Sequence, residues 1–234
     1  MTRRENLFQP IHKGIRSMLY ELGSRLQTTD FANVDESNRF AEHLKRNLNS
    51  SLSSCILCLL RAHSSHEERD IFAKVRVHDQ DAIDFVMKEH AEVSRRILGV
   101  ATTCNEVLKL DSPARRIEVG DRLTLEANDL FANYLTHLNN EEAVLVPIMW
   151  ERFTDEELRS MRSVFYDHLP LSLFEVWMRW TLPSLNMNEL LVLFTGLKAS
   201  SDPTRWNDWV RMAHETLDLS RLRGLEEEVG LGAG

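Results

Sequence analysis

The sequence contains the same arrangement of histidine and glutamate at two places. Residues 63–72 read HSSHEERDIF and residues 137–146 read HLNNEEAVLV, so in both segments a histidine is followed four and five residues later by two glutamates. Side chains four residues apart lie on one face of a helix, about 5 to 6 Å apart at Cβ. Each segment can therefore present an imidazole nitrogen and a carboxylate oxygen to one metal ion.

Four segments with helical periodicity each place one histidine among apolar residues. Apolar side chains recur there at spacings of three and four, which is the pattern of a helix with one buried face. The polar residues on these faces are His12, His63, His90 and His137, together with Glu67 and Glu141 one turn after two of the histidines. We therefore expect all six side chains to point into one helical core.

Burial of these six groups without partners would be costly. Each unsatisfied buried polar group costs about 1 to 3 kcal/mol, and an unpaired charge costs more. A bound cation removes that cost, and imidazole with carboxylate but without thiolate favours iron, manganese or zinc over copper(I). The six residues provide enough ligands for two ions, because each glutamate has two oxygens and can bridge.

The same residues also have simpler interpretations than a metal centre. A single histidine on an apolar face is more often a hydrogen-bonded core residue, and an HxxxE pair is often an intrahelical contact. The repeated motif and the shared faces favour a metal centre over both. His66 and Asp70 also stand four apart, but the second copy has Asn140 and Val144 there, so His66 ranks below the six.

Three further residues lie close to the two motifs. Glu68 and Glu142 are expected either to support the ligands from outside, to fill an open metal position, or to face solvent. Tyr134, one turn before His137, is placed to donate a hydrogen bond near the centre.

The elements that must position these residues are predicted to be helices. The chain has only nine glycines and six prolines, and strand-like alternation is scarce. The expected helices of the first part are 10–27, 36–75 with a bend near 49–54, 80–110 and 114–148. Long helices with short connections form antiparallel bundles in most cases. The predicted fold class is all-α, an antiparallel four-helix bundle with an additional C-terminal helical segment.

The sequence changes in character after Trp150, where the predicted helices become shorter. All five tryptophans lie between residues 150 and 209, and Thr154 followed by Glu157 has the spacing of a helix-capping box. The extension is apolar and is a candidate surface for a homodimer or another protein partner. The predicted domains are a bundle at 8–152, a helical extension at 153–222 and a disordered tail at 223–234.

Composition excludes several classes of function. The formal net charge is −8 without a basic block, which argues against nucleic acid and anionic membranes as partners. No apolar run approaches the roughly 18 residues of a membrane span, and the first residues lack the apolar stretch of a secretory signal. Three cysteines fit a reducing compartment, so a cytoplasmic location is expected. We interpret Cys55, Cys58 and Cys104 as buried core thiols.

The HxxxEExxI/L pattern, the upstream PIH at 10–12 and the EH at 89–90 resemble the hemerythrin-like, HHE cation-binding family. The resemblance covers about residues 8–152. It implies a hemerythrin-like four-helix bundle holding two irons bridged by oxo, hydroxo or carboxylate groups, with manganese and zinc as alternatives. The ligands that it implies are His12, His63, Glu67, His90, His137 and Glu141. In such centres an open position accepts dioxygen or peroxide.

The chain departs from the dioxygen carriers of that family at two positions. Ser94 stands where they have a second histidine, and His137 is followed at four residues by Glu141 where they have an aspartate at five. The ligand set resembles more closely that of iron-sensing and regulatory proteins. The expected function is binding of iron and dioxygen or a related small ligand. A di-iron enzyme acting on peroxide or a small substrate, and a metal-braced interaction module, are the alternatives; no catalytic residue is assigned.

Overall fold

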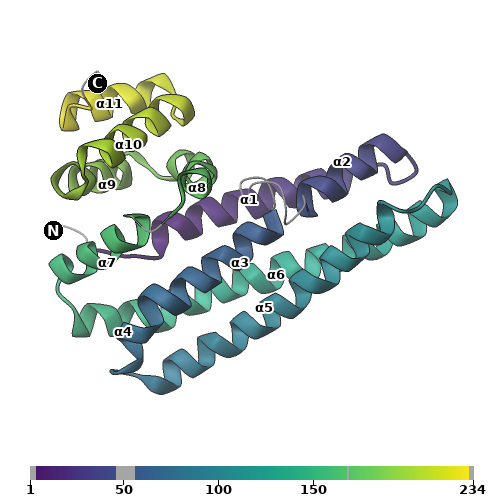
Figure 1. The fold of residues 1–234 in the computed structure, drawn as a ribbon, viewed down its shortest axis with the longest axis horizontal. Coiled ribbons are helices and arrows are strands. Elements are labelled where there is room, and N and C mark those ends of the chain that lie inside the picture. The colour runs from purple at the N-terminus through teal and green to yellow at the C-terminus, as the bar shows by residue number, and fades with distance from the viewer. Residues whose placement is uncertain (1–3, 46–55, 168, 232–234) are drawn as a thin grey trace. The chain divides into compact units, whose positions relative to one another are not determined.

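The computed structural model describes residues 4–45, 56–167 and 169–231 (Figure 1). Regular structure within these ranges is helical throughout, which confirms the predicted all-α class. The helices are α1 Gln9–Thr28, α2 Val34–Lys45, α3 Ile56–Glu67, the π-helix η2 Glu68–Phe72, α4 Ala73–Arg76, α5 Gln80–Val107, α6 Pro113–Arg152, α7 Asp155–Asp167, α8 Leu171–Ser184, α9 Met187–Ser200, α10 Pro203–Thr216 and α11 Leu219–Val229. Among these described helices, none is both long and apolar enough to cross a membrane.

The chain forms two compact units. Residues 18–149 make up the first, here called the bundle unit, and residues 1–17 with 150–234 make up the second, here called the C-terminal unit. The residues at 8–17 and 150–152, which we expected in the bundle domain, thus group with the C-terminal helices. Helices α1 and α6 each contribute to both units.

In the bundle unit, α5 and α6 run antiparallel along their length (Figure 1). Arg96 near the middle of α5 pairs with Asp129 of α6, and Glu106 near the end of α5 pairs with Arg122. Residue numbers therefore rise along one helix as they fall along the other. Helices α2, α3 and α4 pack against α5 and complete the layer around the core. Leu60, Leu123 and Leu130 are fully buried in this core.

The α-helix predicted at 36–75 is interrupted near its end by a π-helix. Helix α2 ends at Lys45, α3 begins at Ile56, and the π-helix η2 interrupts the α-helical pattern at Glu68–Phe72. The predicted bend near 49–54 lies outside the described residues. Apolar spacing does not distinguish one long helix from helical pieces that share a direction, because both keep a buried face.

The C-terminal unit is built around Trp209, which is fully buried. The rings of Tyr166, Phe174 and Phe194 meet it edge-on, at centroid distances of 5.0, 4.8 and 6.1 Å. Such edge-to-face packing is the preferred geometry of aromatic pairs. The aromatic residues after Trp150 therefore form a core of their own.

The start of α1 packs on α8 and α9, which explains why residues 8–17 group with the C-terminal unit. Lys13 Nζ lies 2.6 Å from Glu189 Oε2 of α9. A Cβ on Gly14 would lie 2.7 Å from Thr181 Oγ1 of α8, so only glycine permits this close approach.

Helices α7 and α9 of the C-terminal unit begin with capping boxes. Glu157 N donates to Thr154 Oγ1 at 3.2 Å, and Thr154 N donates to Glu157 Oε2 at 2.8 Å, as predicted for the capping box. Asn186 and Glu189 form a second box at the start of α9.

The prediction that the tail is disordered from residue 223 is wrong for residues 223–229. These residues continue α11, whose N-terminus is capped by the side chain of Asp218. Leu222 and Leu225 are buried, and Gly230 ends the helix at φ 67°, in the left-handed region. The charged residues of this segment suggested exposure to solvent, but burial of the two leucines stabilises the helix.

The cysteines divide into two kinds. Cys104 is buried, as predicted, and its sulfur is not part of a disulfide. Cys58 is half-buried and disulfide-bonded, so the interpretation of Cys58 as a core thiol is wrong. Cys55 lies outside the described residues. Because disulfides are rare in reducing compartments, the disulfide at Cys58 weakens the inference that the protein resides in one. The cytoplasmic location stays a prediction.

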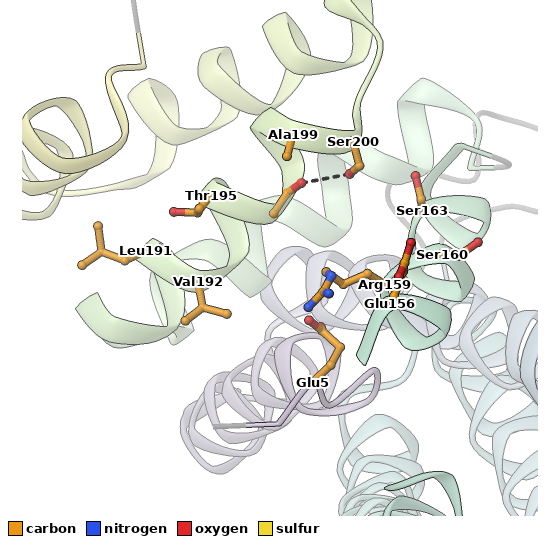
Figure 2. Close-up of a pocket in the computed structure, with 11 residues that line it drawn as sticks. Glu5, Glu156, Arg159, Ser160, Ser163, Leu191, Val192, Thr195, Ala199 and Ser200 are labelled. Carbon is orange, nitrogen blue, oxygen red and sulfur yellow. Dashed lines mark hydrogen bonds between the residues drawn. The ribbon is translucent and has the colours of Figure 1, made fainter. Parts of the chain in front are cut away.

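The C-terminal unit also carries a surface pocket between α7 and α9 (Figure 2). Leu191 and Val192 of α9 form an apolar side, and Arg159 and Ser160 of α7 lie opposite. Glu5, which also lines the pocket, pairs with the buried Arg162. The potential metal clusters among the described residues include none of these side chains.

Candidate metal centre

Four of the six predicted ligands come together inside the bundle unit. Glu67 ends α3, His90 lies on α5, and His137 and Glu141 lie one turn apart on α6. One ligand atom from each lies within 4.8 Å of all the others. All four residues are at most 2% exposed. The spacing of three and four residues along the apolar faces thus places histidine and glutamate together in the core.

The distances among these atoms suit an ion between them. His90 Nε2 lies 3.6 Å from Glu67 Oε2 and 3.9 Å from Glu141 Oε1. His137 Nε2 lies 3.8 Å from Glu141 Oε2. These separations exceed those of hydrogen bonds. Two donors held about 2.0 to 2.2 Å from one metal ion are themselves about 3 to 4 Å apart, which matches the separations here.

Glu67 and Glu141 each direct their two oxygens at different histidines. Glu67 Oε1 lies 3.0 Å from His63 Nε2, while its Oε2 faces His90. Glu141 faces His90 with one oxygen and His137 with the other. Each of these carboxylates therefore presents one oxygen to each of two imidazoles.

The surroundings of His90 Nε2, which faces the carboxylates, indicate whether these residues fit a metal ion. His90 Nε2 makes no hydrogen bond within the described part of the chain, although its ring is 2% exposed. Burial of such a nitrogen is costly unless it has a partner. A cation bound by Glu67 and Glu141 would give it one, so the donor set fits a metal ion.

His12 is fully buried on the part of α1 that belongs to the C-terminal unit. The ring of Phe8 packs on it at a centroid distance of 5.4 Å. Its participation with the other five ligands therefore stays a prediction.

The rivals of these ligands have other contacts. His66 Nδ1 lies 2.7 Å from Arg69 Nη2 and 3.8 Å from Asp70 Oδ2, and the clusters found among the described residues do not include His66. Those clusters also omit Glu68 and Glu142. Ser94, at the position of the histidine found in dioxygen carriers, is exposed.

Tyr134 lies beside the site but its hydroxyl bonds elsewhere. The hydroxyl donates to the backbone carbonyl of Leu60 at 3.1 Å, and the ring meets His137 edge-on at 5.8 Å. Burial raises the pKa of Tyr134 well above its ordinary value, and the charges of Glu67 and Glu141 raise the pKa further. The residue therefore stays protonated and closes one side of the site.

Sequence reasoning missed one residue with a specific contact to a predicted ligand. Glu89 Oε2 lies 3.2 Å from His137 Nδ1, and Asn140 Nδ2 donates to Glu89 Oε1 at 2.6 Å. The pair Glu89–His90 is the EH of the family resemblance, yet no periodicity showed that Glu89 contacts a histidine of another helix. Glu68, left open by the sequence, lies 2.8 Å from His90 Nδ1.

Comparison with known families agrees with this geometry. A family model described as the hemerythrin HHE cation binding domain matches residues 6–149, more than half of the chain. The chain belongs to this family. No curated protein and no solved structure matches it significantly. Membership in the HHE family and the buried histidine–glutamate cluster together make the bundle unit a helical cation-binding domain.

Proposed function

We propose that this HHE protein binds two iron ions and uses them to bind dioxygen or a related small ligand, as a carrier or sensor of oxygen or iron. The observation that carries the proposal is the double orientation of Glu67 and Glu141, whose oxygens face different histidines. Two ions would give each of these oxygens a cation to bind, with both carboxylates as bridges.

The proposed ligands are His12, His63, Glu67, His90, His137 and Glu141. Inclusion of His12 is supported by the course of α1, which is unbroken from Gln9 to Thr28. His12 and Leu19 stand seven residues apart and so share one face of that helix, and both are buried.

When bound, iron would supply the redox chemistry that dioxygen or peroxide requires. The chain supplies burial and charge. Phe72 stacks on His90 at 5.2 Å and Tyr134 meets His137 edge-on, so aromatic rings exclude water from the imidazoles. Two carboxylates offset only part of the charge of two divalent ions, and the remaining positive charge favours an anionic exogenous ligand.

The proposal is tested by the metal content and spectrum of the full chain. Protein produced with iron should contain two irons per chain and show visible absorption that changes between nitrogen, air and peroxide. His63→Ala and Glu141→Ala should lose both iron and absorption. Wild-type protein that contains one iron or none after loading would overturn the di-iron proposal.

A second candidate is an enzyme that acts on peroxide or oxidises a small substrate. Exposed Ser94 contributes no ligand in place of the additional histidine, so fewer imidazoles surround the metals and more positions stay open. Steady release of oxygen from peroxide by the iron-loaded protein, lost in His63→Ala, would favour the enzyme. A lower melting temperature after metal removal, without any ligand chemistry, would instead favour a metal-braced interaction module.

A further inference from the structure

Two carboxylates outside the cluster contact the far nitrogens of two proposed ligands. His90 Nδ1 lies 2.8 Å from Glu68 Oε1, on the side of the ring opposite to the nitrogen that faces Glu67 and Glu141. His137 Nδ1 lies 3.2 Å from Glu89 Oε2, while its Nε2 faces Glu141.

A π-helix begins at the point where two neighbouring glutamates contact one imidazole. Glu67 ends α3 and Glu68 begins η2, where one extra residue enters the turn. Successive residues of a regular α-helix point about 100° apart. Here Glu67 faces Nε2 of His90 and Glu68 faces Nδ1 of the same ring. Such π-helical turns occur frequently at functional sites.

Glu89 is also hydrogen-bonded by Asn140 of α6, the helix that carries His137. Asn140 Nδ2 donates to Glu89 Oε1 at 2.6 Å, and Asn140 follows His137 on α6 by three residues. The Glu89 side chain is 20% exposed and that of Glu68 is 40% exposed, whereas the two imidazoles are at most 3% exposed. Each carboxylate therefore holds a buried ring from a position nearer the surface.

We propose that Glu68 and Glu89 are positioning residues that set the metal affinity of His90 and His137. This inference rests on the proposed function. A carboxylate beside Nδ1 accepts the proton of that nitrogen, so it fixes the tautomer in which Nε2 carries a lone pair for the metal. It also fixes the ring orientation and makes the imidazole a stronger donor. Loss of such a partner lowers metal affinity by about 10- to 100-fold.

The test uses cobalt(II) as the probe, because it suits imidazole and carboxylate ligands and has a visible spectrum that reports ligand geometry. Apparent affinities of the full-length wild type, Glu68→Ala and Glu89→Ala are measured in competition with a chelator. Both variants should bind cobalt about 10- to 100-fold more weakly and shift the cobalt bands. Glu68→Gln and Glu89→Gln retain an acceptor oxygen and should recover part of the affinity.

Glu92→Ala is the matched control. Glu92 lies on α5 three residues after Glu89, and it pairs with Arg95 and Arg96 at the surface. Its removal should leave cobalt affinity within about twofold of the wild type, because exposed pairs contribute little. The metal-free melting temperatures of all variants are measured as well, since a structural role would lower them without shifting the cobalt bands.

The outcomes separate this inference from the proposed function. If the wild type binds two cobalt ions and Glu68→Ala and Glu89→Ala bind them equally well, the positioning role is overturned and the proposed function stands. Weaker binding with an unchanged spectrum and a lower metal-free melting temperature would also overturn it. A wild type that binds no metal would overturn both.

Discussion

The bundle unit and the C-terminal unit both bury charged side chains but satisfy them in different ways. In the C-terminal unit, Glu5 and Arg162 are 7% and 6% exposed and pair directly with each other. In the bundle unit, His90 Nε2 is held 3.6 and 3.9 Å from two carboxylates, too far for a hydrogen bond. The first arrangement is complete within the protein, whereas the second has the separations of ligands around a cation. Polar residues on an apolar face therefore indicate a ligand when their separations are those of coordination.

The largest expected effect concerns the aromatic core. Trp209→Ala should destabilise the C-terminal unit by about 3 to 5 kcal/mol, because it removes a fully buried ring that touches three others. Hydrogen exchange should accelerate in α8, α9 and α10 but stay at the wild-type rate in α3 and α5, which belong to the bundle unit. Equal acceleration in α3 and α5 would contradict an aromatic core whose loss affects the C-terminal unit alone.

Metal removal should act on the other unit. At a metal concentration about 100-fold above the dissociation constant, binding stabilises the folded state by about 2.7 kcal/mol. Chelation should therefore accelerate hydrogen exchange in α3, α5 and α6, which carry the cluster, and leave exchange around Trp209 unchanged. Equal acceleration in both units would contradict the contrast between a self-sufficient core and a metal-dependent one.

Alkaline pH should weaken the aromatic core by a smaller amount. Burial raises the pKa of Tyr166 from 10.0 to about 12. The charge of Arg162 lowers this pKa and the charge of Glu5 raises it, both by less than burial does. Between these values the unfolded chain loses a proton that the folded chain keeps. The stabilisation is therefore fully present below pH 10 and falls by about 1.4 kcal/mol per pH unit above it.

Urea unfolding from pH 8 to 11 measures this effect. Tyr166→Phe should make the alkaline loss shallower but not abolish it, because the pKa of Tyr134 in the bundle unit is also raised. An unchanged slope in Tyr166→Phe would contradict the assignment of the effect to Tyr166.

The smallest expected effect tests a local signal. Thr154→Ala removes the cap at the start of α7 and should cost about 1 kcal/mol. Thr102→Ala is the control, since Thr102 lies inside α5, where its hydroxyl donates to the carbonyl of Leu98 and alanine is the better helix former. The urea midpoint of Thr154→Ala should be lower than that of Thr102→Ala. An equal loss of stability in the two variants would argue against a specific cap.

Much of the local structure was predictable from the sequence. Apolar spacing placed α1, α5 and α6 within a few residues of their observed bounds, and the Thr154–Glu157 box marked the start of α7. The same spacing selected the faces on which Glu67, His90, His137 and Glu141 meet. These features depend on neighbours three or four positions away, so the sequence displays them directly.

The remaining features depend on partners that are distant in sequence. Glu68 and His90 are 22 residues apart, and Glu89 and His137 are 48 apart, so no local pattern reveals those contacts. The π-helix at Glu68–Phe72 and the helical course of residues 223–229 likewise follow from packing. By itself the sequence determined helix periodicity and the chemical identity of the inward groups. The tertiary structure decided which carboxylate faces each nitrogen of His90 and His137, because only folding brings these side chains close to one another.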